Sequence, residues 1–336
     1  MPESKPLTIA MVAKAAGVSP ATVSRILNGT AVVNDEKKKA VDDAVARLGY
    51  VPNPMARGLA GGRTLSIGIM TQAIDSPFYG AALRGIEDQL DPAGYSPLFV
   101  SGHWAEETEL RCLEVLLARR VDGIIVLTGR LTNAELRKIS RKVPVVVTGR
   151  TLQEPNLYSL DFDNFDGGRL ATRHLIELGH TQIAFIAGGA DHPDASERFR
   201  GYRAALKEAG IPFRPSLVIQ GEYHEESGLH AVTTLLSRKV PFTAIFSTND
   251  QMAIGAAHGL QMNGLRVPAD VSLVGFDDLP ISRYAMPPLT TVHQPAYEMG
   301  EMAAQAMLAL LQGETPKQVL SAPRLITRTS TEQPKR

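Results

Sequence analysis

Short apolar runs of strand length alternate with amphipathic segments of helical length from Leu65 onward. This alternation predicts a mostly parallel, doubly wound sheet, in which helices connect successive strands and cover both faces. The expected strands of a first unit cover residues 65–70, 97–100, 123–127 and 143–147, and its expected helices cover residues 78–90, 106–117 and 133–140.

The same alternation starts again near Phe165 and predicts a second unit of similar size. Its expected helices cover residues 165–178, 196–209, 225–237 and 251–262, and its expected strands cover residues 183–187, 217–219, 244–247 and 271–276. A last helix is expected over 297–311 and a strand-like segment over 324–327. Two such units predict an α/β core of two lobes, with a ligand cleft beyond the carboxyl ends of the strands.

The first fifty residues have a different pattern, which predicts a small all-α head. Ser19 is suited to cap a helix, Pro20 suits a first helical position, and Gly17 can take the positive φ of a tight turn. The pattern predicts a helix-turn-helix, with a purely structural helical hairpin as the alternative. The second helix would bury Val23, Ile26 and Leu27, and Gly29 would end it. Its outward face, available to a DNA major groove, would carry Pro20, Ala21, Ser24, Arg25 and Asn28.

A third helix follows, with Asn34 as its cap and Gly49 as its end. The prolines at 52 and 54 then break the helical pattern, and residues 53–60 can form either a short helix or a flexible linker. The chain as a whole is neutral, with 35 basic and 35 acidic residues, whereas residues 1–63 hold nine basic and five acidic ones. This uneven distribution favours a polyanion as the partner of the head, and a solvated basic face is the alternative.

Composition and motifs restrict the other classes of protein. Cys112 is the single cysteine, so no intrachain disulfide forms, and its apolar neighbours indicate a buried thiol rather than a nucleophile. No P-loop, G-x-G-x-x-G, H-E-x-x-H or G-x-S-x-G pattern is present, so we expect no catalytic residues, no metal and no cofactor. The N-terminal residues do not resemble a secretory signal, and no apolar run approaches about 18 residues. These features predict a cytoplasmic protein without a membrane partner, rather than an enzyme or a secreted solute-binding protein on the same core fold.

Residues 8–28, TIAMVAKAAGVSPATVSRILN, resemble the head of the lactose/galactose repressor (LacI/GalR) family, and residues 48–59, LGYVPNPMARGL, resemble the end of its third helix and its hinge. Further similar segments occur in family order: SPFY at 76–79, RVDG at 120–123, DNFDGG at 163–168, LGH at 178–180, RFRGY at 198–202, TNDQMA at 248–253, VGFDD at 274–278 and LTTV at 289–292. The resemblance implies a homodimeric transcription regulator, a repressor in the family's commoner role, that binds a palindromic operator and responds to a small-molecule effector. It implies a core like that of periplasmic sugar-binding proteins, with three chain crossings between the lobes.

The resemblance also implies which residues contact DNA. Pro20, Ala21 and Arg25 take the base-reading positions, and the fork of Arg25 suits the O6 and N7 atoms of guanine. Residues 53–60 correspond to a hinge that becomes helical on the operator, where Leu59 wedges a minor-groove step. The full set is Thr8, Ser19, Pro20, Ala21, Thr22, Ser24, Arg25, Asn28, Asn34, Asn53, Ala56 and Leu59, in which the hydroxyl and amide side chains of the head are expected to contact phosphates.

For the effector, the resemblance implies a site in the cleft. Arg198 corresponds to an arginine that grips the ligand, and Asn249 and Asp277 to polar ligands at strand ends. The expected effector residues are Phe78, Tyr79, Trp104, Asp163, Arg198, Tyr223, Asn249, Phe276, Asp277 and Gln294. The alternatives are strand-end caps for Asn249 and Asp277, a solvated charge for Arg198, and core positions for the two phenylalanines. The histidines at 103, 192 and 293 are interpreted as ordinary polar residues.

Several sugar-responsive members have an acidic residue where this chain has Arg150, which favours an acidic ligand if Arg150 points into the cleft. The effector is therefore expected to be a sugar, a sugar acid or a related metabolite. The expected domains are a DNA-binding head at 1–52, a hinge at 53–62 and an effector-binding core at 63–336. Within the core, lobe 1 covers about 63–164 and 295–323, and lobe 2 about 165–294 and 324–336. No heptad-bearing tail follows, so a dimer is expected rather than a tetramer.

Overall fold

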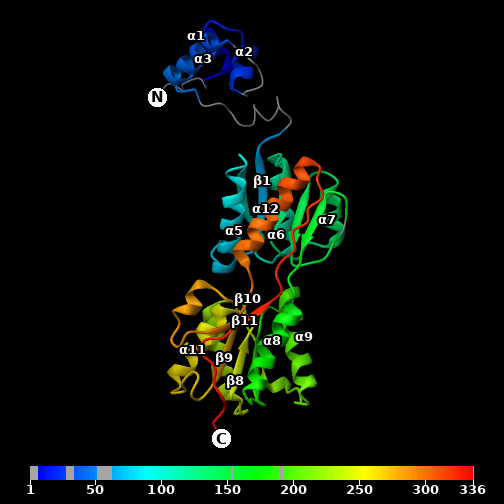
Figure 1. Ribbon diagram of the computed structural model, residues 1–336, viewed down its shortest axis with the longest axis vertical. Helices are drawn as coiled ribbons and strands as arrows, with labels where there is room; N and C mark the ends of the chain where they lie inside the picture. Colours follow the sequence, from blue (N-terminus) through cyan, green and yellow to red (C-terminus); the bar gives the residue numbers. More distant parts are fainter. Residues whose placement is uncertain (1–6, 28–33, 51–62, 153, 190–191, 336) are drawn as a thin grey trace. The chain divides into compact units, whose positions relative to one another are not determined.

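The computed structural model describes residues 7–27, 34–50, 63–152, 154–189 and 192–335 (Figure 1). The chain forms two compact units. The first, here the head unit, contains residues 1–66 with 120–122, and the second, here the core unit, contains residues 67–119 with 123–336.

The head unit contains three helices, α1 (Ile9–Ala16), α2 (Pro20–Leu27) and α3 (Asp35–Leu48). Gly17 ends α1 with a φ of 68°, and the Ser19 hydroxyl accepts a hydrogen bond from the amide of Thr22 at 3.2 Å, as a capping residue does. These features and the buried Val23 confirm the predicted helix-turn-helix. The buried centre of the unit consists of Val12, Ala13, Val23, Val41 and Ala44.

The third helix has the predicted ends. The side chain of Asn34 accepts a hydrogen bond from the Glu36 amide at 2.9 Å, and Gly49 ends the helix with a φ of 61°. The predicted helix end at Gly29 and the predicted hinge at 53–62 lie outside the described residues.

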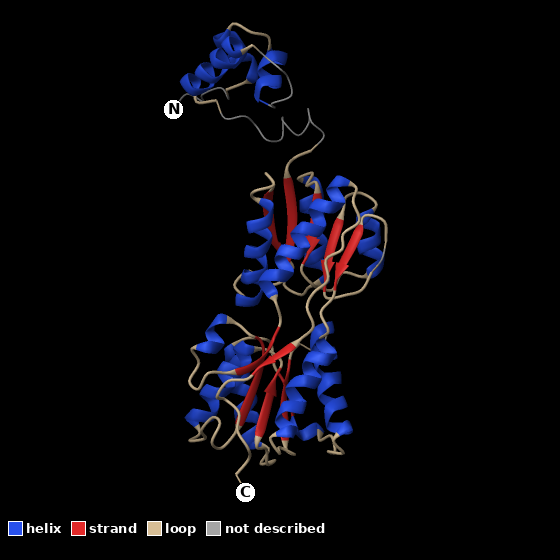
Figure 2. Ribbon diagram, viewed as in Figure 1, coloured by secondary structure: helices blue, strands red, loops and turns tan. Residues whose placement is uncertain are grey.

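A five-stranded sheet in the order β2-β1-β3-β4-β5 forms the first lobe of the core unit (Figure 2). The pairings of β3 with β1 and β4, and of β4 with β5, are parallel. The strands are β1 (Ser66–Thr71), β2 (Ser96–Ser101), β3 (Gly123–Val126), β4 (Val145–Thr148) and β5 (Leu157–Leu160). The helices of this lobe are α5 (Pro77–Leu90), α6 (Glu106–Ala118), α7 (Asn133–Ser140) and α12 (Ala296–Gln312).

A six-stranded sheet in the order β11-β10-β9-β8-β6-β7 forms the second lobe. It is parallel except at β11, which pairs antiparallel with β10. The strands are β6 (Ile183–Ala187), β7 (Val218–Gln220), β8 (Ala244–Ser247), β9 (Ser272–Asp277), β10 (Thr290–His293) and β11 (Arg324–Ile326). The helices are α8 (Asn164–Glu177), α9 (Pro193–Glu208), α10 (Glu225–Ser237) and α11 (Asp250–Met262), with short 3-10 turns η1 (Pro215–Leu217) and η2 (Pro280–Arg283).

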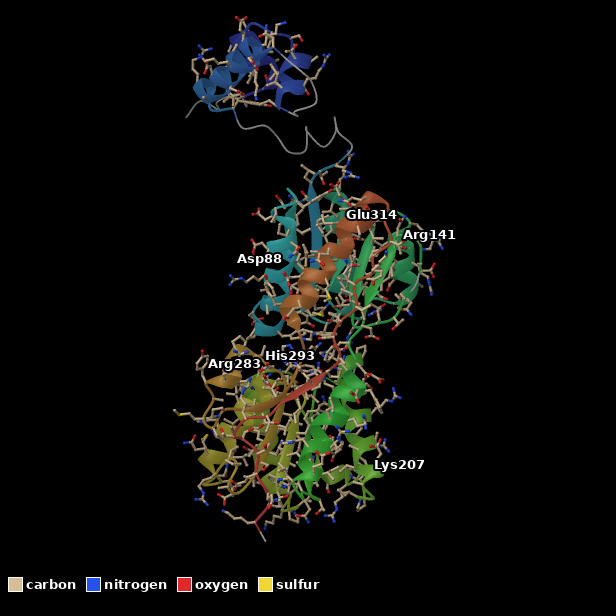
Figure 3. The ribbon with its side chains drawn as sticks, in the orientation of Figure 1. Asp88, Arg141, Lys207, Arg283, His293 and Glu314 are labelled. Atoms are coloured by element: carbon tan, nitrogen blue, oxygen red, sulfur yellow. The ribbon has the colours of Figure 1, made fainter. Side chains whose placement is uncertain are left out.

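The chain passes between the two lobes three times, as expected. It leaves the first sheet after β5, returns after β10 to form α12 against α5, and crosses again to add β11 to the second sheet (Figure 1). Asp88 and Lys207 are exposed on helices α5 and α9, and Arg141 is exposed directly after α7 (Figure 3). Among the described residues, no helix is long and apolar enough to cross a membrane.

Most elements have ends within two residues of the predicted ones, and the larger differences are two unpredicted strands and one helix start. β5 and β10 were not predicted, because LYSL and TTVH are four-residue segments without a distinctive apolar run. Helix α9 begins at Pro193, three residues before the expected start, because proline fits the first turn of a helix.

Candidate functional site

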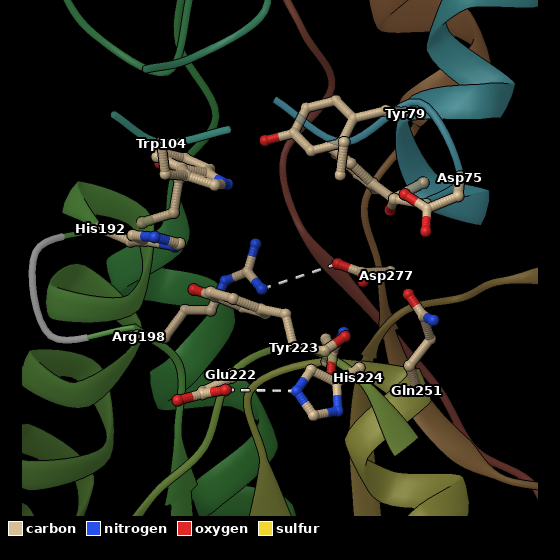
Figure 4. A pocket seen from close by; sticks show the side chains of 15 residues that line it. Asp75, Tyr79, Trp104, His192, Arg198, Glu222, Tyr223, His224, Gln251 and Asp277 are labelled. Atoms are coloured by element: carbon tan, nitrogen blue, oxygen red, sulfur yellow. Dashed lines mark hydrogen bonds and ion pairs between the residues drawn. The ribbon is translucent and has the colours of Figure 1, made fainter. Parts of the chain in front are cut away.

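A pocket of about 290 Å³ lies between the two lobes of the core unit (Figure 4). The first lobe contributes Ala73, Asp75, Ser76, Phe78, Tyr79 and Trp104 to its wall. The second lobe contributes His192, Asp194, Arg198, Glu222, Tyr223, His224, Asn249, Gln251 and Asp277.

The topology explains why these residues meet. Most of them lie in the segments that directly follow β1, β2, β6, β7 and β8, and Asp277 is the last residue of β9. Because the pairings given for both sheets are parallel apart from that of β11, the carboxyl ends of these strands lie at one edge, where ligands bind in open α/β sheets. The sequence therefore places polar side chains from distant segments around one cavity.

Arg198 lies at the centre of the second-lobe wall and is 4% exposed. Its Nε donates to the Asn164 side-chain oxygen at 2.9 Å, its Nη1 to the Thr248 carbonyl, and its Nη2 to the Gln294 side-chain oxygen at 2.7 Å. The guanidinium carbon lies 3.7 Å from the centre of the Phe276 ring. These contacts fix the guanidinium in one orientation, so a ligand meets a preorganised fork of donors.

Asp277 lies beside this guanidinium, with its Oδ1 atom 3.6 Å from Nη1 of Arg198. Burial raises the pKa of Asp277 well above its usual range, and the positive charge of Arg198 opposes that rise only in part. Burial likewise raises the pKa of Asp194, in the first turn of α9. Both carboxyl groups therefore gain from a ligand that donates hydrogen bonds to them.

Aromatic rings form another part of the wall. The ring of His192 stacks between Trp104 of the first lobe and Tyr223 of the second, with centroid distances of 3.7 Å and 5.1 Å (Figure 4). Tyr79 packs edge-on against Phe78, and its hydroxyl forms a hydrogen bond with the Thr128 hydroxyl at 3.0 Å. Flat apolar faces of this kind suit the ring of a sugar or another planar group.

Asn249 has two roles in the structure. Its side-chain oxygen accepts a hydrogen bond from the Met252 amide at 2.9 Å and caps α11, and its nitrogen donates to the Tyr223 carbonyl at 2.9 Å. The capping alternative for this residue is therefore confirmed, and the residue also lines the pocket.

Seven of the ten predicted effector residues line this pocket: Phe78, Tyr79, Trp104, Arg198, Tyr223, Asn249 and Asp277. The other three lie around it. Asp163 caps α8 by accepting a hydrogen bond from the Asp166 amide at 2.8 Å. Gln294 holds Arg198, and Phe276 is completely buried beneath the guanidinium, so the core alternative holds for this phenylalanine.

Sequence reasoning missed several lining residues. His192 lies in the wall, contrary to its interpretation as an ordinary polar residue, and Asp194 follows two positions later. Asp75, Glu222, His224 and Gln251 were not predicted either. Each follows the carboxyl end of a parallel strand by a few residues, and this position is the signal that would have identified them.

Arg150 does not line this pocket. Its Nη1 donates to the Leu131 carbonyl at 2.6 Å and its Nη2 to the Gly129 carbonyl at 2.7 Å, so the guanidinium holds the loop after β3. The condition for an acidic ligand, an Arg150 that points into the pocket, is therefore not met. No cluster of His, Cys, Asp and Glu side chains suited to a metal ion occurs among the described residues.

In the head unit, the residues expected to face DNA lie at or near the surface of α2 and its flanking turns. Thr8, Ser19, Pro20, Ala21, Arg25 and Asn34 are exposed, and Thr22 and Ser24 are half-buried. Opposite them, Val23 is buried and Ile26 and Leu27 pack against the centre of the unit. Asn28, Asn53, Ala56 and Leu59 lie outside the described residues.

Comparison with known proteins matches both units. Residues 8–53 match the bacterial regulatory proteins of the lacI family, and residues 172–331 match a periplasmic binding protein-like domain. Catabolite control protein A of Priestia megaterium is 37% identical over 311 residues, which are 92% of this chain and 94% of that protein.

Two solved structures have the same architecture. A lac repressor dimer bound to operator and the anti-inducer ONPF has a TM-score of 0.87 at 33% identity, over 98% of this chain and 100% of that one. The transcriptional regulator CelR in complex with cellobiose has a TM-score of 0.71 at 34% identity, over 96% of this chain and 99% of that one. The matched helix-turn-helix, the two-lobed core and the extent of identity lead to one assignment: the chain is a DNA-binding transcription regulator, not an enzyme, and it belongs to the LacI family.

Proposed function

We propose that this regulator is a repressor that binds a palindromic operator as a homodimer, and that a carbohydrate or carbohydrate derivative in the core-unit pocket controls its affinity for DNA. We further propose the division into a DNA-binding head at 1–52, a hinge at 53–62 and a core at 63–336, with lobes at about 63–164 with 295–323 and at about 165–294 with 324–336. Because operator DNA lies in the cytoplasm, we place the protein there.

The observation that carries the effector proposal is the pairing of donors, acceptors and aromatic faces in one pocket. Arg198 offers an oriented fork, Asp277 lies 3.6 Å from it, and the rings of Trp104 and Tyr223 lie nearby. Hydroxyl pairs of a sugar can accept hydrogen bonds from Arg198 and donate hydrogen bonds to Asp277. The apolar face of the sugar ring can stack on the aromatic rings. A related regulator of this architecture was solved with cellobiose, which supports a carbohydrate here.

We propose that the predicted effector residues fall into groups according to the part of the effector that they contact. Arg198, Asp277 and Asn249 contact polar groups of the effector, while Phe78, Tyr79, Trp104 and Tyr223 contact its ring. Gln294 and Phe276 hold Arg198 in place, and Asp163 holds the start of α8. These last three act on the effector through other residues.

For DNA, we propose that α2 lies in the major groove and that Arg25 reads a guanine. Pro20 and Ala21 lack hydrogen-bond donors on their side chains, so they contribute shape and apolar contact. The polar residues Thr8, Ser19, Thr22, Ser24, Asn28 and Asn34 contact phosphates, and Asn53, Ala56 and Leu59 belong to the hinge in the minor groove. Two heads related by a two-fold axis require a two-fold operator.

Selection of duplexes from a random pool by the purified full chain tests this proposal. The expected result is enrichment of one palindromic site, and sedimentation of the complex as two chains per duplex. A second selection by the Arg25→Ala variant is expected to lose a G·C preference at symmetric positions. Enrichment of a site without two-fold symmetry, or of no site, contradicts the proposal.

A further inference from the structure

The carboxylates of the pocket outnumber its cations. Among the described residues, the wall contains the carboxyl groups of Asp75, Asp194, Glu222 and Asp277. Its guanidinium group is that of Arg198. Asp75 and the Glu222 side chain are exposed, so water screens their charges. The two carboxyl groups that decide the electrostatics are the less exposed ones, Asp194 and Asp277.

Most N–H groups of Arg198 are already occupied within the protein. Three of its five N–H groups donate to the side chains of Asn164 and Gln294 and to the Thr248 carbonyl, and Asp277 lies 3.6 Å from Nη1. The guanidinium therefore has few free donors left for an anionic ligand, and Asp277 lies beside it. Arg150, the other nearby arginine, donates to backbone carbonyls outside this pocket.

The charges of Arg198 and Arg150 act on Asp194 only from a distance. In the part of the chain that the structure describes, no hydrogen bond or ion pair reaches its carboxylate, and a Cβ built on Gly149 of the first lobe would lie 3.4 Å from its Oδ1. The carboxylate therefore sits at the junction of the two lobes, on the pocket wall. Burial raises the pKa of Asp194, and the charges of Arg198 and Arg150 oppose that rise only in part.

We propose that this pocket selects an uncharged or positively charged carbohydrate, a neutral sugar or an amino sugar, and excludes sugar acids and sugar phosphates, with Asp194 as the residue that determines this selection. The inference rests on the proposed effector site. A hydroxyl or ammonium group of the ligand donates to Asp194 and relieves the cost of burying its charge. A carboxylate or phosphate placed in the same cavity adds a like charge to a poorly solvated one, which is strongly unfavourable.

The test uses full-length protein and sets of sugars that share one framework. The probes are glucose, glucosamine, glucuronate and glucose 6-phosphate, and the corresponding galactose compounds. Trp104 is the only tryptophan of the chain and lies in the pocket wall, so its emission reports binding directly, with the shift in melting temperature as a second readout. In each framework that binds, the neutral or amino member is expected to bind at least about tenfold more tightly than the anionic members.

Two variants assign the effect to a residue. Asp194→Asn removes the negative charge and is expected to reduce the preference for the amino sugar over the sugar acid by about tenfold. Asp75→Asn removes an exposed carboxylate of the same pocket and is expected to change the preference by less than about twofold.

Tighter binding of the acid or phosphate member overturns the inference, as does the absence of any binding, or an equal effect of the two variants. Operator binding is measured separately on the ligand-free protein. If the chain selects no palindromic DNA, the repressor proposal is refuted independently of the sugar titrations. The preference for neutral or amino sugars over anionic ones is still measured by Trp104 emission.

Discussion

Asp250 is a buried carboxyl group that joins three elements of the second lobe. At the start of α11, it accepts hydrogen bonds from the Ser282 hydroxyl and the Thr291 hydroxyl, both at 2.6 Å, and from the Leu279 amide at 2.8 Å. Burial raises its pKa to about 7, while these hydrogen bonds lower it and the charge of Asp278 adds to the rise. The charged form is therefore less favourable in the folded protein than in the unfolded chain.

This raised pKa predicts a pH-dependent stability. A carboxyl group whose pKa is higher in the folded state keeps its proton there, so its contribution is complete below about pH 4 and is lost as the pH rises through about 7. Between pH 5 and pH 8, the free energy of unfolding of the natural chain is expected to fall relative to Asp250→Asn by on the order of 3 kcal/mol. Urea denaturation of both proteins at several pH values measures this difference. Parallel stability curves would show that the hydrogen bonds fully offset the burial.

Arg198 allows a second prediction for a single residue. Lysine keeps the positive charge at this position, but its ammonium group cannot reproduce the planar set of bonds to Asn164, Thr248 and Gln294. Arg198→Lys is expected to lower the affinity for a bound sugar by at least about tenfold and the free energy of unfolding by about 1–3 kcal/mol, because buried acceptors lose their donors. Sugar titration followed by Trp104 emission, with urea denaturation, measures both. Operator binding of the ligand-free variant serves as the control and should be retained.

Three helix pairs of the core unit pack through glycines on both helices. A Cβ at Gly85 of α5 would collide with the Tyr297 carbonyl of α12, and one at Gly300 of α12 would collide with the Ala82 carbonyl of α5. The same reciprocal arrangement occurs between α8 and α9, at Gly168 and Gly201, and between α10 and α11. Each glycine brings two helix backbones closer than any larger side chain permits, which sets the positions of the strands and loops next to the pocket.

Two glycines of α5 make a matched test of this packing. Gly85→Ala forces α5 away from α12 and is expected to lower the free energy of unfolding by about 1–3 kcal/mol. Gly80→Ala adds a methyl group to open space in the same helix and is expected to raise it by about 0.5–1 kcal/mol, because alanine is the better helix former. Thermal melts of the two variants and of the natural chain measure these opposite changes in stability. Equal shifts of the same sign would mean that α5 and α12 adjust without strain.

Periodicity predicted the longer elements well because each carries its own signal. The helix at 225–237 and the strand at 183–187 have the predicted bounds, since the spacing of apolar residues marks the extent of each element. β5 and β10 lack such a signal, because neighbouring strands rather than their own composition make them strands. In the pocket, motifs identified Arg198 and Asp277, whereas His192 and Asp194 become lining residues only through the tertiary fold.

The chain separates the residues proposed to contact DNA and those proposed to contact the effector into different compact units. The exposed face of α2 belongs to the head unit, and every residue of the pocket wall belongs to the core unit. In a protein of this kind, a ligand controls DNA binding only if it binds two states of the molecule with different affinities. A substitution that removes a DNA contact should therefore leave the affinity of the ligand for DNA-free protein unchanged.

Arg25→Ala tests this separation. Arg25 is exposed on α2 and belongs to the head unit, so its loss should remove about 1–3 kcal/mol of discrimination at one base pair in each half-site, while sugar binding to the DNA-free protein stays unchanged. Lys14→Ala removes one exposed positive charge from α1 of the same unit and should instead weaken binding to all sequences by a similar factor. Competition binding with the selected operator and single-base variants, at two salt concentrations, distinguishes these outcomes. If Arg25→Ala behaves like Lys14→Ala, then Arg25 contacts phosphate, and base reading must come from Pro20, Ala21 and the shape of the DNA.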